Sequence, residues 1–474
     1  MTILFAASEV APFASTGGLG DVMASLPTYL GYLGHEVAVA LPGYPALLHE
    51  AEPLGVEFDI PLGNETLRAE VYERLSPEGT QWMLIRNEAL FERDGIYGDS
   101  QGPFADNASR FIFFSKAVVE LARRLQPSPH ILHLHDWHTA LVPVLIRDQK
   151  LPLKTLLTLH NVEHQGAFWS LDFPLTNLSS RWFSPEGLEF FGQINLLKAG
   201  ILSADAVTTV GKLYRESILH TPEGRGLQPA LLHRQADLHF VPNGVDESLW
   251  DPASTTEIPA PFSATDLRGK ATCREALLQE VGLAPAPSGP VFAMISRLAE
   301  QKGFDLLLPL LPRLLAADCR LVILGDGDPA LRRDLLIASR QHPERFAFLN
   351  RWEAPLAKRI LAGADYLVAP SHSEPCGLTP LHALRYGTIP IAHAVGGLQE
   401  NLTSFDPTTR QGDALLYGPD SSEALWDTLQ RALAIFSQKN HHRVLISNAM
   451  RASFSWAGPA SQYDSIYRRI CGAA

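Results

Sequence analysis

The stretch Ser15-Thr16-Gly17-Gly18-Leu19-Gly20-Asp21-Val22 sets the pattern for the N-terminal half of the chain. An apolar, strand-like run over residues 2–7 precedes it, and apolar residues at helical spacing follow from Val22 onward. Glycines let the backbone approach a ligand closely, and the start of a helix offers N–H groups to an anion. The stretch therefore predicts a strand, a glycine loop and a helix. The loop either binds a phosphate or a sugar hydroxyl, or it forms only a tight turn.

The same alternation of strands and helices continues on both sides of a Pro-, Ser- and Thr-rich segment at residues 251–264. Helices are expected at residues 110–125 and 192–202. The expected strands are residues 2–7, 36–40, 130–134, 155–159, 206–210 and 238–241 before this segment, and residues 291–295, 321–324, 346–349, 366–369 and 389–392 after it. Such alternation predicts parallel sheets covered by helices on both faces.

We therefore expect an α/β protein of two doubly wound, Rossmann-like domains. They would span residues 1–250 and 265–453, with a linker at residues 251–264 and a final helical segment at residues 454–474. Ligands of such sheets bind at the carboxyl ends of the strands. If the two domains face one another, a cleft lies between those ends, and loops from both domains supply its chemistry.

Composition excludes several classes of partner. A chain of 474 residues is too long for one ordinary core. The net charge of -12 argues against a nucleic-acid backbone or an anionic membrane as the main partner. The four cysteines lack paired spacing, which suits a reducing cytosol, so we expect a cytoplasmic protein. The apolar N-terminal run has no basic flank and is too short for a signal peptide, and no stretch reaches the length of a membrane span.

The motif HLHDWH at residues 133–138 ends a strand of the first domain. Its histidines and aspartate allow a metal site, but the spacing misses the HxHxDH pattern of binuclear metallohydrolases by one residue. We expect His133 and His135 to be structural, since alternate residues of a strand share a face. Asp136 and Trp137 suit a sugar: the carboxylate accepts hydroxyl hydrogens and the ring packs on a C–H face. Alternatively, Asp136 caps a helix.

Two more polar motifs of this domain follow strand-like runs. His160 in the pair at residues 160–161 is either a structural histidine or a group of the cleft. Asn243 begins the sequence NGVD and is either part of a turn or an amide that bridges ligand hydroxyls.

In the second domain, SRLAEQKG at residues 296–303 follows the strand at residues 291–295. Arg297 and Lys302 would hold and neutralise a diphosphate leaving group without a metal, or they are solvated surface charges.

The sequence SHSEPCGLT at residues 371–379 follows the strand at residues 366–369. Glu374 would contact a sugar, while the N–H groups of Gly377, Leu378 and Thr379 face a phosphate.

Eight motifs in one order across nearly the whole chain together resemble the bacterial glycogen synthase and plant starch synthase family. They are the glycine loop, HDWH at 135–138, HN at 160–161, NGVD at 243–246, SRLxxQKG at 296–303, EPCGL at 374–378, YGTIP at 386–390 and GGL at 396–398. The resemblance implies a retaining glycosyltransferase of the GT-B fold that transfers glucose from ADP-glucose to the non-reducing end of an α-1,4-glucan or malto-oligosaccharide.

The resemblance also implies front-face attack within an ion pair, without a metal ion, a cofactor or a covalent enzyme intermediate. No nucleic acid or membrane partner is expected. The C-terminal helix, residues 454–470, would cross back to pack on the first domain.

Residue roles follow from the resemblance by position. The catalytic residues would be Arg297, Lys302, Glu374, His160 and Asp136. Donor-binding residues would be Ser15, Gly17, Gly18, Asp21, Asn243, Trp352, Gly377, Leu378 and Thr379. Acceptor-binding residues would be Glu9, Tyr97, Trp137 and His138.

Three positions depart from the family pattern. Ser15 stands where family members usually carry lysine, so a cation near the donor is missing. Trp352 takes the place of the adenine-stacking aromatic residue and can stack adenine or uracil, and Glu400 replaces a usual aspartate. Two alternatives therefore stay open. One is a related retaining transferase with UDP-glucose or a short oligosaccharide acceptor, and the other is a weakly active relative that mainly binds glucan or regulates a partner.

Overall fold

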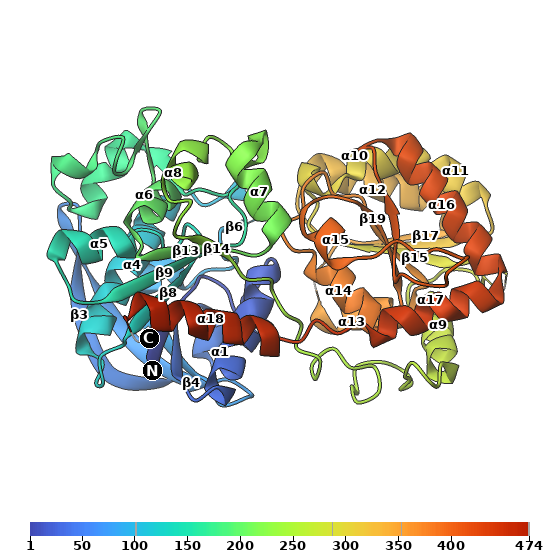
Figure 1. Cartoon of the computed structure of the whole chain (residues 1–474), viewed down its shortest axis with the longest axis horizontal. Coiled ribbons are helices and arrows are strands. Elements are labelled where there is room, and N and C mark those ends of the chain that lie inside the picture. Colours follow the sequence, from blue (N-terminus) through green and yellow to red (C-terminus); the bar gives the residue numbers. More distant parts are fainter. Residues whose placement is uncertain (100–101, 287, 352, 473–474) are drawn as a thin grey trace. The chain divides into compact units, whose positions relative to one another are not determined.

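The computed structural model describes residues 1–99, 102–286, 288–351 and 353–472, and the chain divides into two compact units. Unit 1 comprises Met1–Gly244 and Trp456–Ala474, and unit 2 comprises Val245–Ser455. Each unit is built around its own sheet with helices packed against it (Figure 1). Both units are of the expected doubly wound α/β kind.

Unit 1 contains a nine-stranded sheet of order β14-β13-β9-β8-β1-β2-β5-β4-β3. Its strands from β14 to β5 run parallel, whereas β4 and β3 are antiparallel to their neighbours. The strands are β1 (Thr2–Ala6), β2 (Glu36–Pro42), β3 (Glu52–Leu62), β4 (Glu65–Leu75), β5 (Gln81–Arg86), β8 (Ile131–His135), β9 (Lys154–Leu159), β13 (Ala206–Thr209) and β14 (Leu238–Phe240). The sequence analysis missed β3, β4 and β5.

Several helices of unit 1 connect these strands. They are α1 (Gly18–Tyr32), α2 (Pro45–Leu48), α3 (Glu88–Phe91), α4 (Asn107–Arg124), α5 (Val142–Gln149), α6 (Leu196–Ser203), α7 (Lys212–His220), α8 (Gln228–His233) and α18 (Ala457–Ile470), with 3-10 turns at Ser170–Thr176, Ser180–Trp182 and Pro222–Gly224. Helix α1 begins at Gly18 rather than near Val22, so only Ser15, Thr16 and Gly17 of the glycine stretch precede the helix and the rest of that stretch forms its first turn.

A small three-stranded sheet corrects one predicted helix. Its strands are β10 (Ala167–Trp169), β12 (Gln193–Asn195) and β11 (Glu189–Phe190), and a separate ribbon pairs β6 (Gly98–Asp99) with β7 (Gly102–Pro103). The helix expected over residues 192–202 therefore begins only at Leu196. Asn195 ends the strand and caps α6, because its side chain accepts a hydrogen bond from the Lys198 N–H.

The C-terminal helix α18 belongs to unit 1 and packs against α1. It is the red helix labelled beside α1 in Figure 1. The buried Tyr467 hydroxyl lies 2.7 Å from Nδ1 of His133 in β8, so the end of the chain is hydrogen-bonded to a central strand. The predicted return of this helix to the first domain is confirmed.

Unit 2 contains a six-stranded, fully parallel sheet of order β17-β16-β15-β18-β19-β20. The strands are β15 (Val291–Ile295), β16 (Arg320–Leu324), β17 (Phe346–Leu349), β18 (Tyr366–Ala369), β19 (Ile389–His393) and β20 (Leu415–Tyr417). The helices are α9 (Arg268–Glu280), α10 (Phe304–Leu307), α11 (Leu311–Ala316), α12 (Pro329–Gln341), α13 (Ala354–Gly363), α14 (Leu378–Arg385), α15 (Gly396–Asn401), α16 (Ser422–Ser437) and α17 (Lys439–Arg451), with 3-10 turns at Glu300–Lys302 and Leu308–Leu310.

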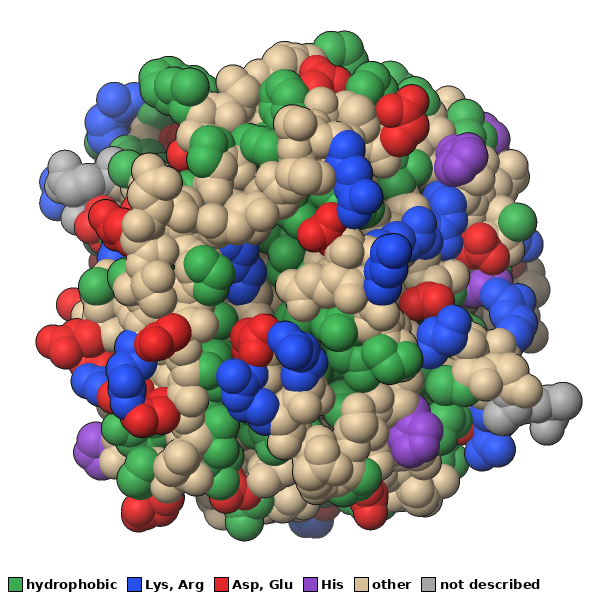
Figure 2. Space-filling view, turned by 90° about the vertical axis from the view of Figure 1, so that its left-hand side faces the viewer, with side chains coloured by type: hydrophobic (Ala, Val, Ile, Leu, Met, Phe, Trp, Pro, Cys, Tyr) green, Lys and Arg blue, Asp and Glu red, His purple; other side chains and the backbone are tan. Residues whose placement is uncertain are grey.

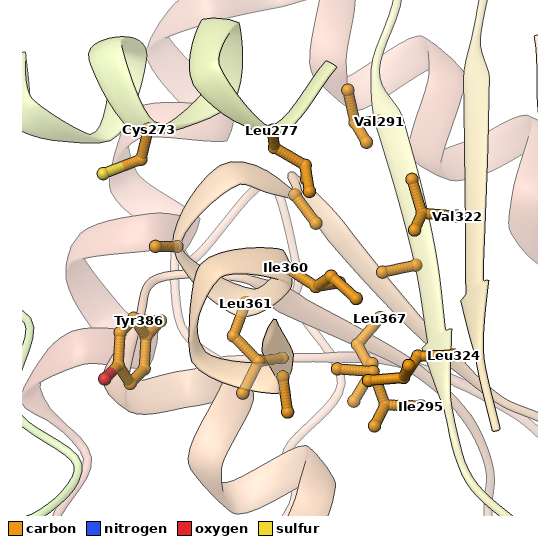
Figure 3. Close-up of a cluster of buried hydrophobic side chains, with 14 of the residues drawn as sticks. Cys273, Leu277, Val291, Ile295, Val322, Leu324, Ile360, Leu361, Leu367 and Tyr386 are labelled. Carbon is orange, nitrogen blue, oxygen red and sulfur yellow. The ribbon is translucent and has the colours of Figure 1, made fainter. Parts of the chain in front are cut away.

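The core of unit 2 forms where helices meet the sheet. Figure 3 shows Leu277 of α9 and Ile360 of α13 pointing toward the apolar side chains of β15 and β16. Residues 251–264, expected as a linker, belong to unit 2, and their Ile258 and Phe262 are buried in this core. Two apolar anchors thus fix a segment that is otherwise rich in turn-forming residues.

In both sheets the strand order reverses at a strand that lies next to the motifs. In unit 1, β1 lies between β2 and β8, and in unit 2, β15 lies between β16 and β18. Crossovers leave such a switch point in opposite directions, which opens a crevice at the carboxyl ends of the two adjacent strands. The loops after β1, β8, β15 and β18 are therefore the expected positions for ligand contacts.

Two observations bear on surfaces. Within the described ranges, no helix is long and apolar enough to cross a membrane. On the face of the molecule shown in Figure 2, acidic and basic side chains are interspersed.

Candidate active site

The carboxylate of Glu9 organises the glycine loop of unit 1. Glu9 lies just after β1 and is buried. Its Oε2 accepts the N–H groups of Thr16 at 2.7 Å and Gly17 at 3.2 Å, and its Oε1 accepts the hydroxyls of Thr16 at 3.0 Å and Tyr97 at 2.6 Å. Two N–H groups that an external anion would need are therefore already taken by the protein itself. Glu9 therefore holds the loop through these hydrogen bonds. Its predicted contact with the acceptor stays a prediction.

Tyr97 and His138, both predicted acceptor contacts, lie together. Their rings stack with centroids 4.7 Å apart, and the Tyr97 hydroxyl lies 2.7 Å from the Ser8 hydroxyl. His138 is buried, and its Nδ1 has no hydrogen-bond partner in the part of the chain that the structure describes. Burial lowers the pKa of His138 well below its ordinary value, so the ring is neutral.

Ser15 is packed against the start of α1. Its hydroxyl donates to the Gly17 carbonyl at 3.1 Å, and a Cβ at Gly20 would lie 2.3 Å from Oγ of Ser15. The Ser15 hydroxyl is thus bonded within the loop itself, at the position where the resemblance implies a lysine. Farther along, burial and the charge of Glu9 raise the pKa of Asp21 to about 7. Gly17 and Gly18 are exposed at the first turn of α1.

Asp136 joins the ends of two neighbouring strands. It follows β8 with a positive φ of 57°, and its Oδ1 accepts the N–H of His160 at 2.7 Å and of Asn161 at 3.4 Å. It does not cap α5, whose N-cap is Leu141. Burial raises the pKa of Asp136 to about 7 despite these two hydrogen bonds. Asp136 and His160 are therefore brought together at the carboxyl ends of β8 and β9.

The ring of His160 is oriented by a second histidine. His160 Nε2 lies 2.9 Å from His135 Nδ1, while the buried His135 Nε2 has no partner among the described residues. An orphaned buried N–H is costlier than an orphaned acceptor, which favours the proton of His135 on Nδ1 and that of His160 on its own Nδ1. Burial lowers the pKa of His160 to about 3, so the ring acts as a neutral hydrogen-bonding group.

Trp137 is less open than the sequence led us to expect. Its side chain is only 8% exposed and packs edge-to-face with Phe111 and Phe168. Gly166 approaches so closely that a Cβ there would lie 2.5 Å from the indole. The indole therefore presents at most an edge to a sugar.

Asn243 fits the ligand role better than the turn role. It is 7% exposed, and its Oδ1 is buried without a hydrogen-bond partner in the described ranges. A buried amide oxygen without a partner is costly unless a ligand donates to it. The next residue, Gly244, packs against Trp456 and fixes the backbone at this point.

In unit 2, the predicted cations lie after β15. Lys302 Nζ lies 2.7 Å from Glu374 Oε2, and both side chains are largely buried. Glu374 Oε2 also accepts the Ser371 hydroxyl at 3.1 Å. Arg297 is exposed and has neither an ion pair nor a hydrogen bond among the described residues. One paired and one unpaired cation thus stand at the carboxyl end of the central strand.

Glycines let the segments around Glu374 come close together. Gly303 has φ +70°, and a Cβ there would lie 1.9 Å from the carbonyl oxygen of Pro370. Gly396 has φ +46°, and a Cβ there would lie 2.3 Å from the carbonyl oxygen of Glu374. A side chain at either position would clash with the backbone of the segment that carries Glu374.

The predicted phosphate contacts follow Glu374 directly. Gly377 has φ +83° and precedes α14, so Leu378 and Thr379 lie in its first turn. The N–H groups of a first helical turn have no partner within the helix, and the helix dipole favours an anion there. Trp352, the predicted base-stacking residue, lies outside the described residues.

His372 is a residue of this region that the sequence analysis passed over. It lies between Ser371 and Glu374, and its ring contacts Asp305 and Asp420 at hydrogen-bonding distance. A histidine two residues before a predicted sugar-binding glutamate was the one available signal. Within the described ranges, no group of three or more His, Cys, Asp or Glu side chains is arranged to hold a metal ion.

Comparisons with known proteins identify the relatives of this chain. Residues 2–233 match the starch synthase catalytic domain family, and residues 281–451 match the glycosyl transferases group 1 family. A glycogen synthase of Anaeromyxobacter sp. (strain Fw109-5) is 41% identical, with 99% of each chain covered. A glycogen synthase 2 of Geobacter sulfurreducens is 36% identical over 99% of this chain and 98% of the relative.

Solved structures show the same relationship. The catalytic domain of starch synthase IV from Arabidopsis thaliana, bound to ADP and acarbose, superposes with a TM-score of 0.93 at 29% identity and covers 99% of each chain. Sucrose-phosphate synthase from Thermosynechococcus elongatus shares the fold, with a TM-score of 0.66 at 19% identity. The chain belongs to the glycogen synthase and starch synthase family of glycosyltransferases.

Proposed function

We propose that this glycosyltransferase transfers glucose from ADP-glucose to the non-reducing end of an α-1,4-glucan, with retention at the anomeric carbon and without a metal ion. The observation that carries the proposal is the group formed by Arg297, Lys302 and Glu374 after β15 and β18. A sugar nucleotide leaves as a diphosphate, so the cost of the reaction lies in the negative charge that develops there. Arg297 and Lys302 are the cations placed to take up that charge.

The Lys302–Glu374 ion pair supports an exchange of partners. The carboxylate of Glu374 neutralises Lys302, with Oε2 and Nζ 2.7 Å apart. When a diphosphate enters, Lys302 turns to it, and the carboxylate of Glu374 becomes free to accept hydroxyl hydrogens of the transferred glucose. The first turn of α14, with Gly377 before it, adds N–H groups for the phosphates.

Bond changes in this proposal balance without any further reagent. The bond between the anomeric carbon and the diphosphate oxygen breaks, and the 4-hydroxyl oxygen of the acceptor bonds to the same face of the anomeric carbon. The acceptor's proton passes to the departing ADP. Each turnover therefore yields one longer glucan and one ADP.

The polar groups at the strand ends of unit 1 are neutral or weakly acidic. His160 offers an uncharged ring that hydrogen-bonds a sugar hydroxyl, and Asn243 offers its buried amide oxygen. Asp136 acts mainly through His160, because its carboxylate already holds the backbone of that residue. The acceptor lies near Tyr97 and His138.

The relatives support the choice of donor. The starch synthase IV structure was bound to ADP, and the curated relatives are named glycogen synthases. UDP-glucose is the competing donor, because Ser15 removes a family cation whose loss changes how the donor is held. We propose a cytoplasmic site of action, because the four cysteines are free and lack paired spacing, which suits a reducing compartment.

Product analysis tests the reaction. The enzyme, dialysed against EDTA, is given maltoheptaose with ADP-glucose or UDP-glucose, and the products are read by chain length and by the proton signal of the new anomeric centre. The proposal predicts longer chains with α-linkages from ADP-glucose in EDTA. A β-linkage, a strict need for added metal, or extension from UDP-glucose alone would contradict it.

A further inference from the structure

His372 stands between two carboxylates next to the catalytic group. Its Nδ1 lies 2.7 Å from Asp420 Oδ2, and its Nε2 lies 2.8 Å from Asp305 Oδ1. The imidazole is 29% exposed, whereas the two aspartates are about half exposed, at 42% for Asp420 and 59% for Asp305. Both nitrogens of one ring are thus engaged by acidic groups.

This geometry specifies the charge of the ring. A neutral imidazole carries a single N–H, so it can donate to one carboxylate while its bare nitrogen faces the other. Two ionised carboxylates at these distances require a proton on each nitrogen. Burial lowers the pKa of His372, but the hydrogen bonds and charges of Asp420 and Asp305 outweigh burial and raise this pKa above its ordinary value of 6.5.

Other titratable groups surround this cluster. His393 of β19 has its Nδ1 3.9 Å from Asp420 Oδ1, although the same nitrogen lies 3.0 Å from the Ser371 carbonyl oxygen. Tyr417 of β20 is buried, which raises its pKa above the ordinary value, so it stays neutral. Glu374 and Lys302 neutralise one another nearby. The two aspartates therefore dominate the charge environment of His372.

The bridge connects three segments of unit 2. Asp305 lies in α10, three residues after Lys302, and Asp420 lies just before α16. The His372 N–H donates to the Gln301 carbonyl at 2.9 Å, which adds a backbone link to the segment of Lys302. Two residues farther along is Glu374. The two partners of the catalytic ion pair are thus held by segments that His372 ties together.

We propose that His372, as an imidazolium bonded to both Asp305 and Asp420, is a positioning residue that holds the Lys302 and Glu374 segments in the arrangement that receives the diphosphate. This role rests on the proposed function. When the ring loses its proton, one of the two bonds is lost and the segments loosen. Donor turnover should therefore fall as the pH rises through the pKa of His372.

The first test measures the charge directly in the full-length protein. Histidine labelled with 13C and 15N is titrated by NMR, and the His372 signal is assigned by its loss in His372→Arg. We expect a pKa above 6.5 that falls in both Asp305→Asn and Asp420→Asn. A His372 pKa at or below 6.5, or one that neither substitution changes, would overturn the bridge whether or not the protein transfers glucose.

The second test measures the effect on the reaction. For His372→Gln we expect kcat/KM for ADP-glucose at pH 6.5 to fall about three- to tenfold, the range for loss of a partly exposed charge-assisted contact. His372→Arg keeps a cation at all pH values, so it should keep kcat/KM near the wild-type value and should remove the decline at high pH. His441→Arg, which changes an exposed histidine of α17 bonded to Gln438, is the matched control and should keep the wild-type profile.

The outcomes separate the two proposals. A wild-type decline at high pH that persists unchanged in His372→Arg would overturn the positioning role, as would a His372→Gln variant with wild-type kcat/KM. Absence of glucose transfer at every pH, together with a raised and aspartate-dependent His372 pKa, would overturn the proposed function and with it the positioning role, while the charge state of the bridge would stand.

Discussion

Replacing Glu9 by glutamine tests whether a buried carboxylate holds the glycine loop. The change keeps the size of the side chain and removes its charge. The amide oxygen can still accept the N–H groups of Thr16 and Gly17, and the amide nitrogen can donate to the hydroxyls of Thr16 and Tyr97, which rotate to accept. All four hydrogen bonds remain, but none of them involves a charged group any longer.

The expected cost follows from those contacts. A hydrogen bond to a charged group contributes about 1.5–3 kcal/mol, against about 0.5–1.5 kcal/mol for a neutral one. Local opening at Thr16 and Gly17 breaks the two backbone N–H bonds, each of which is weakened by about 1 kcal/mol, so the loss at these two groups is about 2 kcal/mol. Removing the repulsion between Glu9 and Asp21 returns a part of this, which leaves a net loss of about 1–2 kcal/mol. Glu9→Ala, which deletes all four contacts, should cost about twice as much.

Hydrogen–deuterium exchange of the peptide that contains Thr16 and Gly17 is the direct assay. A loss of 1–2 kcal/mol in local opening corresponds to exchange about five- to thirtyfold faster. Glu36→Gln is the matched control, because Glu36 accepts one exposed hydroxyl, that of Thr2, at 3.1 Å. Loop exchange within twofold of wild type in both Glu9 variants would refute the view that Glu9 holds the loop.

Three further predictions address other parts of the site. The pKa of Asp136 is raised in the folded state, so its contribution to stability is present at low pH and is lost as the pH rises toward about 7. In urea unfolding measured from pH 5 to 8, Asp136→Asn should reduce this loss of stability by more than about 1 kcal/mol. An unchanged dependence of stability on pH in the variant would contradict the prediction. Ser15→Lys should lower the Kd for ADP-glucose about tenfold by calorimetry, since it adds a cation at the glycine loop; an unchanged Kd would remove the loop from the donor site. Gly303→Ala should lower the melting temperature and reduce the turnover rate at least tenfold, because φ is +70° and a Cβ would meet the carbonyl oxygen of Pro370. Gly418→Ala, with open space around it, should behave as wild type, and equal behaviour of the two variants would refute the packing argument.

The sequence predicted most of the parallel strands because they are apolar on both faces, but it missed the parallel strands β5 and β20. The strand expected at residues 291–295 is β15 itself, and the others agree within one or two residues. The strands β3 and β4 were missed because exposed residues alternate with buried ones or outnumber them, so no apolar run marks them. The strands β10, β11 and β12 are two or three residues long and leave no periodic signal.

The positions of candidate site residues were predictable where these residues directly follow the carboxyl ends of parallel strands. Asp136, Arg297 and Glu374 lie after β8, β15 and β18, as the sequence indicated. What local sequence could not give are partners far apart in the chain. Glu9 meets Tyr97, 88 residues away, and His372 meets Asp305 and Asp420, 67 and 48 residues away. Which site residues are buried also depends on the tertiary fold, so the local sequence could not show it.

Incorporation of labelled glucose into glycogen tests the central claim most directly. ADP-glucose and UDP-glucose are supplied in parallel to the wild-type enzyme and to Lys302→Ala, with thermal unfolding as the check on folding. The account predicts incorporation from ADP-glucose, and a loss of about a hundredfold or more in the folded Lys302→Ala variant. Absence of incorporation from either donor while glycogen still binds, or a Lys302→Ala variant with wild-type turnover, would contradict it.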